Sequence, residues 1–318
     1  MGPTNLPIQI NSFVGREREI AEVKRLLSSS HIITLTGTGG CGKTRLAIQI
    51  ATSMSENFAD GVWLVDLSSV HEPLLVPQLV SLALGLHPLA DQPLLELLQN
   101  HVRYRQLLLV MDNCEHLLEN CAQLAHQLIT SSSDLRILAT SREPLVITGE
   151  TVFPITGLVW PSTDKDLEKK PEELMQYDAV RLFIERARTI LPNFKLTHEN
   201  SRSIVEICQR LDGLPLALEL ASTRVNVLTV QEITSRLNDR FDLLVSNQRE
   251  SIELRHHTLR AAIDWSYTLL SIEEQILLRR LAIFEAGCTL DTVEAICTGE
   301  GFGCILFWSG LLKMQTLL

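Results

Sequence analysis

The stretch "TGTGGCGKT", residues 36–44, lies between the apolar run "HIITL" and the amphipathic stretch "RLAIQIATSM". Gly37, Gly42, Lys43 and Thr44 fit the pattern G-x-x-x-x-G-K-[ST], with a predicted strand before the loop and a predicted helix after it. Glycines let the backbone curl so that successive N–H groups point inward, and the start of a helix adds partial positive charge. The stretch therefore predicts a loop that cradles phosphate groups.

The last residues of this loop have separate expected roles toward a bound nucleotide. Lys43 is expected to bridge the β- and γ-phosphates, and Thr44 to offer its hydroxyl to Mg²⁺. Cys41 lies near a helix start and could act as a redox-sensitive thiol, although a small side chain at a permissive position is the preferred interpretation. A chance glycine-rich turn is the alternative for the whole loop, but the G-K-T triplet has no ordinary packing role. The predicted nucleotide-contacting residues are Gly37, Thr38, Gly39, Gly40, Cys41, Gly42, Lys43, Thr44 and Arg45.

Two acidic residues follow another apolar run, "LLLVM". Asp112 ends this predicted strand, and the carboxyl ends of parallel strands share one edge of a sheet with the loop. Asp112 is therefore expected to hold Mg²⁺ together with Thr44. Glu115 is the better candidate to activate the attacking water, because the neighbouring Asn113 carries an amide, which cannot accept that proton. The alternative is that Glu115 only begins a helix, where acidic residues are favoured.

Arg142 follows the next predicted strand, "LRILATS", in the segment "ATSRE". A guanidinium at this sheet edge could contact the γ-phosphate and report its presence, or stabilise charge during phosphoryl transfer. The alternative is an ordinary surface arginine. Arg142 is therefore grouped with Asp112 and Glu115 as a candidate catalytic residue.

Strand and helix patterns alternate through the first half of the chain. Strands are predicted at 31–37, 61–67, 106–112, 135–141 and 151–155, with helices at 16–29, from about Lys43, through 74–86, and at 93–102 and 115–129. Helix-length crossovers between strands predict a parallel sheet covered on both faces, a doubly wound α/β fold. The strand at 61–67 intervenes between the loop and Asp112, which resembles the ASCE division of P-loop ATPases, with its inserted strand.

The composition becomes polar and proline-containing around residues 158–174, which predicts a boundary near 160–172. The expected organisation is a P-loop nucleotide-binding domain at 1–160 and a small helical domain at 172–250. A third domain at 251–318 is predicted to begin with helices at 258–270 and 271–284.

Bulk composition limits the possible partners and compartments. The 318-residue chain carries a formal net charge of −10, which gives no general attraction to nucleic acid or anionic membrane. Its seven cysteines form no CxxC pair, as expected for reduced thiols in a cytoplasmic protein. We find neither a signal-peptide pattern nor an apolar run of membrane-spanning length.

Six motifs together resemble a known family. They are "FVGRE" (13–17), the loop itself, "LLLVMDNCEHL" (107–117), "ILATSREPL" (137–145), "GLPLALELAS" (213–222) and "TLRAAIDWSYTLL" (258–270). In order and spacing the chain resembles the NB-ARC or STAND family of signalling ATPases, specifically those of bacterial LuxR-type and SARP-type transcriptional regulators. The resemblance covers about residues 8–297.

The resemblance implies an adenine nucleotide, ATP or ADP with Mg²⁺, bound between two domains. It implies that Val14 and Arg16 contact adenine, with Gly15 grouped beside them as a nucleotide-binding residue, that Arg142 senses the γ-phosphate, and that Pro215 presses on the adenine from the helical domain. The alternative for Pro215 is a proline that starts a helix, a common position for it. Slow hydrolysis would then reset a switch in which the γ-phosphate biases how the domains pack, with self-association in the ATP state as a further expectation.

The resemblance also implies that residues 251–318 form a partial winged-helix domain. The segment 298–318, "TGEGFGCILFWSGLLKMQTLL", departs from the family pattern, so we expect a truncated or frameshifted chain; the alternative is a short protein whose last helix packs on the helical domain. No DNA-binding domain is recognisable in the chain. An ATP-dependent small-molecule kinase and a nucleotide-binding scaffold without turnover are the alternative functions.

Overall fold

The computed structural model describes residues 2–70, 72–87, 92–162, 169–237 and 272–281. The predicted helix at 258–270, most of the predicted winged-helix domain and the atypical tail at 298–318 lie outside the described residues. One helix of the last part is described, α14 (Ile272–Leu281), and it falls within the segment 271–284 that the sequence predicts as helical.

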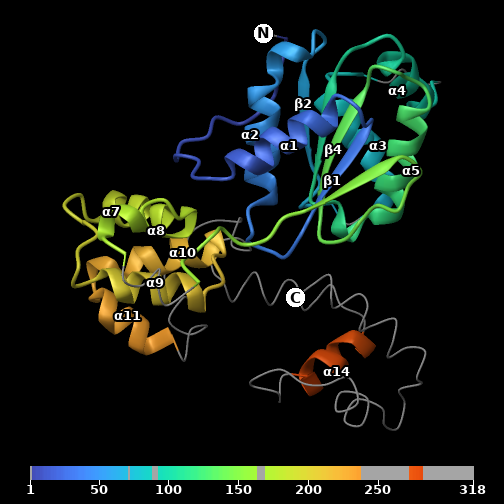
Figure 1. The fold of residues 1–318 in the computed structure, drawn as a ribbon. Helices are drawn as coiled ribbons and strands as arrows, with labels where there is room; N and C mark the ends of the chain where they lie inside the picture. The colour runs from blue at the N-terminus through green and yellow to red at the C-terminus, as the bar shows by residue number, and fades with distance from the viewer. Residues whose placement is uncertain (1, 71, 88–91, 163–168, 238–271, 282–318) are drawn as a thin grey trace.

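Five short strands form one parallel sheet in the order β2-β3-β4-β1-β5 (Figure 1). Strands β1 and β3 are buried along their whole length, as is typical of parallel strands covered on both faces. The predicted doubly wound α/β sheet is confirmed, including its last candidate strand. The strands are β1 (Ile32–Thr36), β2 (Val62–Asp66), β3 (Leu108–Asp112), β4 (Arg136–Ser141) and β5 (Glu150–Pro154).

The order of the strands defines the ASCE arrangement. Strand β4 lies between β1, which leads into the loop, and β3, which carries Asp112. Strand β2 lies beyond β3 at the edge of the five-stranded sheet. The strand that separates β1 from β3 in space is therefore β4, and not β2, which intervenes between them only along the chain.

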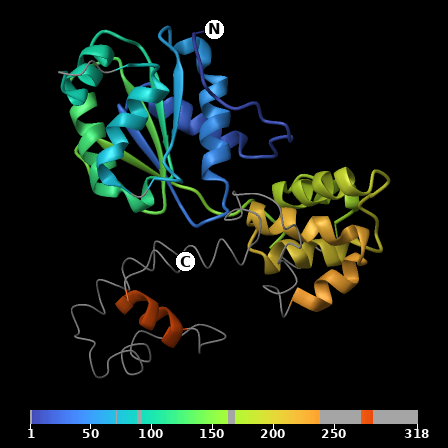
Figure 2. The same cartoon turned by 180° about the vertical axis from the view of Figure 1, so that it is seen from behind.

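Helices cover both faces of the sheet because alternate strand residues point to opposite sides (Figures 1 and 2). Ile33, Leu35 and Val110 share a buried core with α1 (Glu17–Leu27) and α2 (Lys43–Ser53). Leu109 and Met111 share another with the helices of the opposite face. Those helices are α3 (Val76–Ala83), α4 (Leu94–Val102) and α5 (Leu118–Ile129); short 3-10 turns are η1 (Ser55–Asn57), η2 (Pro73–Leu75) and η3 (Cys114–His116).

One helix boundary differs from the sequence prediction. The predicted helix at 115–129 is divided into η3 and α5, because Leu117 departs from helical geometry; Asn113, with a left-handed backbone at φ 62°, precedes η3. Glu115 consequently lies in the turn that follows β3 and not in the first turn of α5. Its position is fixed by the end of the sheet.

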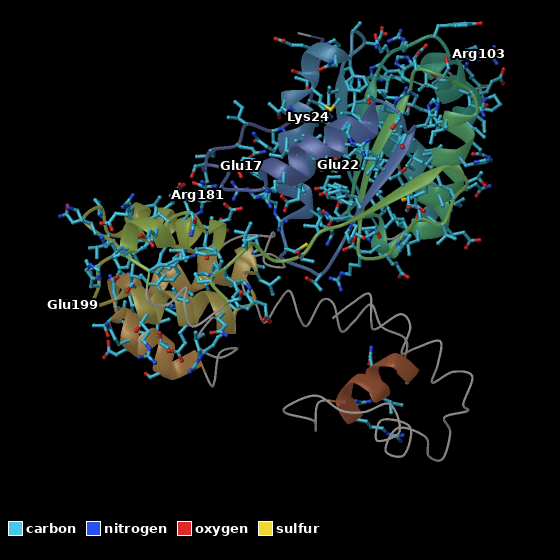
Figure 3. The ribbon with its side chains drawn as sticks, in the orientation of Figure 1. Glu17, Glu22, Lys24, Arg103, Arg181 and Glu199 are labelled. Atoms are coloured by element: carbon cyan, nitrogen blue, oxygen red, sulfur yellow. The ribbon has the colours of Figure 1, made fainter. Side chains whose placement is uncertain are left out.

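The helices between residues 171 and 236, here called the helical group, share a separate buried core that includes the fully buried Phe183. Val14 and Leu158 also belong to this core, so the segments that precede and follow the sheet in sequence both contribute to it. Arg181 of α8 pairs with Glu17 at the start of α1, with Nη2 and Oε1 3.1 Å apart (Figure 3). The elements are α7 (Pro171–Leu174), α8 (Asp178–Ile190), α9 (Ser201–Arg210), α10 (Pro215–Ser222), η4 (Thr223–Asn226) and α11 (Val230–Arg236).

Candidate nucleotide-binding site

The glycine-rich loop joins β1 to α2 and depends on backbone conformations that favour glycine. Gly40 has φ 80°, and a Cβ added there would lie 3.0 Å from the Leu216 side chain. At Gly37, with φ 151°, an added Cβ would lie 2.3 Å from the Ile155 carbonyl oxygen. A side chain at either position would displace the loop from its neighbours. The loop is therefore closely enclosed by α10 and by Ile155, the residue that follows β5.

Lys43 lies in the first turn of α2 and its side chain returns over the loop. Its Nζ donates to the carbonyl oxygens of Gly37 at 2.8 Å and Thr38 at 3.1 Å. The residue is only 8% exposed, so these carbonyls supply much of the solvation that its buried charge needs. The ammonium group is thus fixed within the loop.

The two predicted magnesium ligands are in direct contact. The Thr44 hydroxyl donates to Oδ1 of Asp112 at 2.8 Å, and the Thr140 hydroxyl from the end of β4 donates to the same oxygen at 2.5 Å. Asn113 donates its side-chain amide to Oδ2 at 3.0 Å. Sequence reasoning placed Thr140 at this edge but gave it no role; its adjacency to Asp112 follows from the pairing of β3 with β4.

Burial, with smaller contributions from the charges of Asp66 and Glu115, raises the pKa of the Asp112 carboxyl to about 6, against the opposing effect of hydrogen bonds from Thr140 and Thr44. Among the described residues no group of three or more His, Cys, Asp and Glu side chains could hold a metal ion. Mg²⁺ in nucleotide sites commonly takes one or two protein oxygens together with phosphate oxygens. The hydroxyl and carboxylate pair fits that donor set.

Glu115 and Arg142 are brought together at the same edge of the sheet. Nε of Arg142 lies 3.3 Å from Oε1 of Glu115, and both side chains are 4% exposed. Burial lowers the pKa of Arg142, whereas the neighbouring Glu115 charge raises it. Oε2 of Glu115 is buried with no hydrogen-bond partner within the described part of the chain. Arg142 is therefore not an ordinary surface arginine, and it pairs with the predicted general base.

A small cavity of about 30 Å³ beside the loop is lined by three predicted adenine-contacting residues, Val14, Arg16 and Pro215. Arg16 also anchors the loop, because its Nη2 donates to the carbonyl oxygens of Cys41 at 2.9 Å and Thr156 at 2.6 Å. Gly15 packs against Asp178, where an added Cβ would clash. The cavity is lined by Phe13, Val14, Arg16, Gly42, Arg45, Leu158, Leu182 and Pro215.

Helix α10 begins directly on the loop. The backbone N–H of Leu216 donates to the Gly40 carbonyl at 3.2 Å, and Pro215 occupies the first helical position. Arg45, which the sequence grouped with the nucleotide-contacting residues, directs its guanidinium to Glu219 of α10 and to the carbonyls of Asn11 and Ser12. Sequence reasoning missed Ser12 and Glu219, because nothing in their local pattern indicates these contacts.

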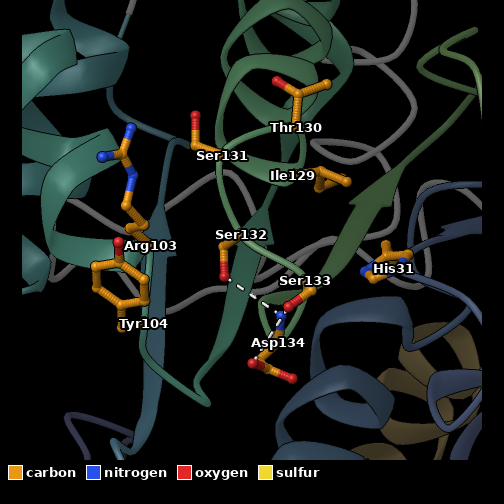
Figure 4. A pocket seen from close by; sticks show the side chains of 9 residues that line it. All are labelled: His31, Arg103, Tyr104, Ile129, Thr130, Ser131, Ser132, Ser133 and Asp134. Carbon is orange, nitrogen blue, oxygen red and sulfur yellow. Dashed lines mark hydrogen bonds between the residues drawn. The ribbon is translucent and has the colours of Figure 1, made fainter.

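A larger cavity of about 510 Å³ lies at the opposite, amino edge of the sheet, next to the residues that precede β1 and β4 (Figure 4). It contains none of the motif residues. Its lining consists of His31, Arg103, Tyr104, Ile129, Thr130, Ser131, Ser132, Ser133 and Asp134. The candidate catalytic residues predicted from the sequence therefore lie at the carboxyl edge of the sheet and not at this cavity.

The fold and the loop define a P-loop NTPase of the ASCE division. Residues 16–153 match the NB-ARC domain family. A Mycobacterium tuberculosis protein described as uncharacterized, Rv0894, is 38% identical over 287 residues, which cover 90% of this chain and 69% of that protein. The chain belongs to the NB-ARC family of P-loop NTPases, and it is a nucleotide-binding ATPase module.

Further relatives are larger proteins. An M. tuberculosis protein named as an HTH-type transcriptional regulator, Rv0890c, is 40% identical over 278 residues, covering 87% of this chain and 30% of its own length. The regulatory protein AfsR of Streptomyces griseus is 25% identical over 295 residues, which cover 86% of this chain and 28% of AfsR. This chain thus spans less than a third of either regulator.

A solved structure shares the fold. The Walker-type ATPase of Pyrococcus abyssi superimposes with a TM-score of 0.58 at 14% sequence identity, covering 96% of this chain and 90% of that one. Within the described residues, no helix is both long and apolar enough to span a lipid bilayer.

Proposed function

We propose that this chain is an ADP- and ATP-dependent switch in which the bound nucleotide sets how the helical group of residues 171–236 packs on the sheet. The observation that carries the proposal is the contact of α10 with the phosphate loop, through Leu216 N–H and the Gly40 carbonyl. A group that senses the γ-phosphate at this loop can favour one arrangement of the two parts over the other.

The loop residues fit the phosphates of such a nucleotide. The backbone N–H groups of residues 38–44 would cradle them, and Lys43 would exchange its contacts with Gly37 and Thr38 for phosphate oxygens. Thr44 and Asp112 would hold Mg²⁺, which neutralises developing phosphate charge when it is bound. Val14, Gly15, Arg16 and Pro215 would enclose the adenine base.

Sensing of the γ-phosphate would depend on the ion pair between Arg142 and Glu115. With ATP in the loop, Arg142 would contact γ-phosphate oxygens in place of Glu115. The released carboxylate of Glu115 would then accept a proton from the attacking water. Because Glu115 would become available as a base only after Arg142 has left it, hydrolysis would be slow, which suits a switch that must persist in one state.

The names of larger relatives support a place within a transcriptional regulator, because two of them are described as regulators and this chain aligns with part of each. We propose that the switch controls such a protein, with self-association in the ATP state as its output. A small-molecule kinase would instead transfer phosphate to an acceptor, and a scaffold would bind nucleotide without turnover.

The deciding experiment identifies the nucleotide that copurifies with the protein and then follows γ-phosphate release from added ATP. A switch predicts copurified ADP and release that is slow and abolished by Glu115→Gln. Release that accelerates only with a small-molecule acceptor would favour a kinase. Bound nucleotide with no release above the Glu115→Gln background would favour the scaffold.

A further inference from the structure

Glu219 on α10 pairs with arginines from two other helices. Its Oε1 lies 3.2 Å from Nη1 of Arg45, at the start of α2, and 2.8 Å from Nε of Arg186, on α8. The Arg186 side chain is 9% exposed, whereas those of Arg45 and Glu219 are 37% and 31% exposed. One partly buried carboxylate therefore joins the helix after the phosphate loop to the helical group.

The same two arginines hold the N-terminal segment of residues 11–14, here called the strap. The Ser12 carbonyl accepts from Arg45 at 3.1 Å and from Arg186 at 2.8 Å. The Ser12 hydroxyl donates to Glu185 at 2.7 Å. The Arg45 guanidinium carbon also lies 5.9 Å from the centre of the Phe13 ring. The strap is thus positioned by the cluster around Glu219.

The cluster of Glu219, Arg45 and Arg186 is connected to residues that line the small cavity beside the loop. Glu219 lies four residues after Pro215, so both side chains project from the same face of α10. Pro215 lines the cavity, and so do Phe13 and Val14 of the strap. A shift of Glu219 would therefore move residues that line the cavity, while Lys43 would keep its contacts with the phosphate loop.

Charge balance explains why Glu219 is needed. It is the carboxylate that Arg45 and Arg186 share, and the two guanidinium groups would repel one another without it. Burial lowers the pKa of Arg45, and the charge of Arg186 lowers it further, while Glu219 raises it. Removing the Glu219 charge would favour separation of α2, α8 and the strap.

We propose that Glu219 is a positioning residue which, through Arg45 and Arg186, holds the strap and α10 around the base of the bound nucleotide. This inference rests on the proposed function, since it assigns the cavity to the nucleobase. It predicts that the cluster controls affinity for the base-containing part of ADP and leaves binding of the phosphates alone unchanged.

The test compares ADP with inorganic pyrophosphate by calorimetric titration of the full chain with Mg²⁺ present. Glu219→Gln should weaken ADP binding about tenfold, as expected for loss of a coupled charge network, while pyrophosphate affinity stays within about twofold. The matched control is Glu206→Gln, which removes a carboxylate paired with Arg210 on α9, away from the cavity. It should leave both affinities unchanged.

Arg45→Gln provides a second variant should Glu219→Gln fail to fold, and it should show the same selective loss for ADP. Combining the two substitutions should cost less than the product of their separate effects. Equal ADP affinity in parent and Glu219→Gln would overturn the positioning role, as would equal weakening of ADP and pyrophosphate. If the parent chain bound neither compound, the proposed function itself would fail, which is a separate result.

Discussion

Lys43 is the residue whose charge lies inside the phosphate loop, at 2.8 Å from the Gly37 carbonyl. Lys43→Ala should weaken ADP binding about a hundredfold or more, since loss of a buried charged partner costs about 2–5 kcal/mol. Titration of a fluorescent ADP analogue measures this loss, with the exposed Lys195→Ala as the control for charge. Unchanged ADP affinity in a folded Lys43→Ala protein would show that the loop is not part of the nucleotide-binding site.

Asp112 and Glu115 should respond differently to loss of charge. Asp112→Asn removes a proposed magnesium ligand, so it should weaken ATP binding in the presence of Mg²⁺ and have little effect without Mg²⁺. Glu115→Gln should leave ATP binding largely intact and slow hydrolysis about a hundredfold or more, the usual contribution of a general base. Binding titrations and single-turnover hydrolysis separate the two roles. A parental hydrolysis rate in Glu115→Gln would place the base elsewhere.

A third prediction at the residue scale concerns the ion pair of Arg142 and Glu115. Arg142→Gln should remove the preference between ATP and ADP, because the group proposed to sense the γ-phosphate is lost. It also leaves a buried carboxylate unpaired, which lowers stability by about 3–5 kcal/mol. The double variant Arg142→Gln with Glu115→Gln should recover stability without recovering the preference. Competition titrations and urea unfolding measure both, and a retained preference in either variant would exclude Arg142 as the sensor.

At the scale of elements, the contact of α10 with the phosphate loop depends on Gly40. Gly40→Ala introduces strain at φ 80° and also brings a Cβ to 3.0 Å from Leu216. Gly149→Ala is the matched control, because its φ is 84° but an added Cβ there has no neighbour within 4 Å. Both should lose about 1 kcal/mol of stability from backbone strain in urea unfolding. Gly40→Ala should lose more, and it alone should weaken ADP binding.

The elements themselves were largely predictable from the sequence, because their signals are local. Buried parallel strands appear as short apolar runs, and α1 and α2 show helical spacing of apolar residues, so their existence follows from periodicity. The start of α5 was predicted too early because the pattern "EHLLENCAQLAHQLI" is helical throughout, whereas Asn113 just before it has a left-handed backbone and Leu117 within it departs from helical geometry. These breaks involve no glycine or proline that would have indicated them.

At the scale of the molecule, a switch predicts that nucleotide affects distant parts of the chain together. Addition of ADP with Mg²⁺ should slow amide hydrogen exchange in the loop, in the strap and at the start of α10. Exchange in α4, which lies away from the site, should remain unchanged. Lys43→Ala should show none of this protection. Protection confined to the loop would mean that the nucleotide does not join the sheet to the helical group.

The sequence by itself determined the phosphate loop, the parallel α/β fold and the carboxyl edge on which Asp112, Glu115 and Arg142 lie. These features are encoded by residue types and spacings within short segments, so they can be recognised without knowledge of distant contacts. The tertiary structure decided which strand lies between β1 and β3, that Thr140 contacts Asp112, and that Glu115 pairs with Arg142. It also decided that Arg45 and Glu219 meet across 174 residues of chain. Local periodicity specifies which face of an element is buried, but the partner on that face is selected only when all the elements pack together.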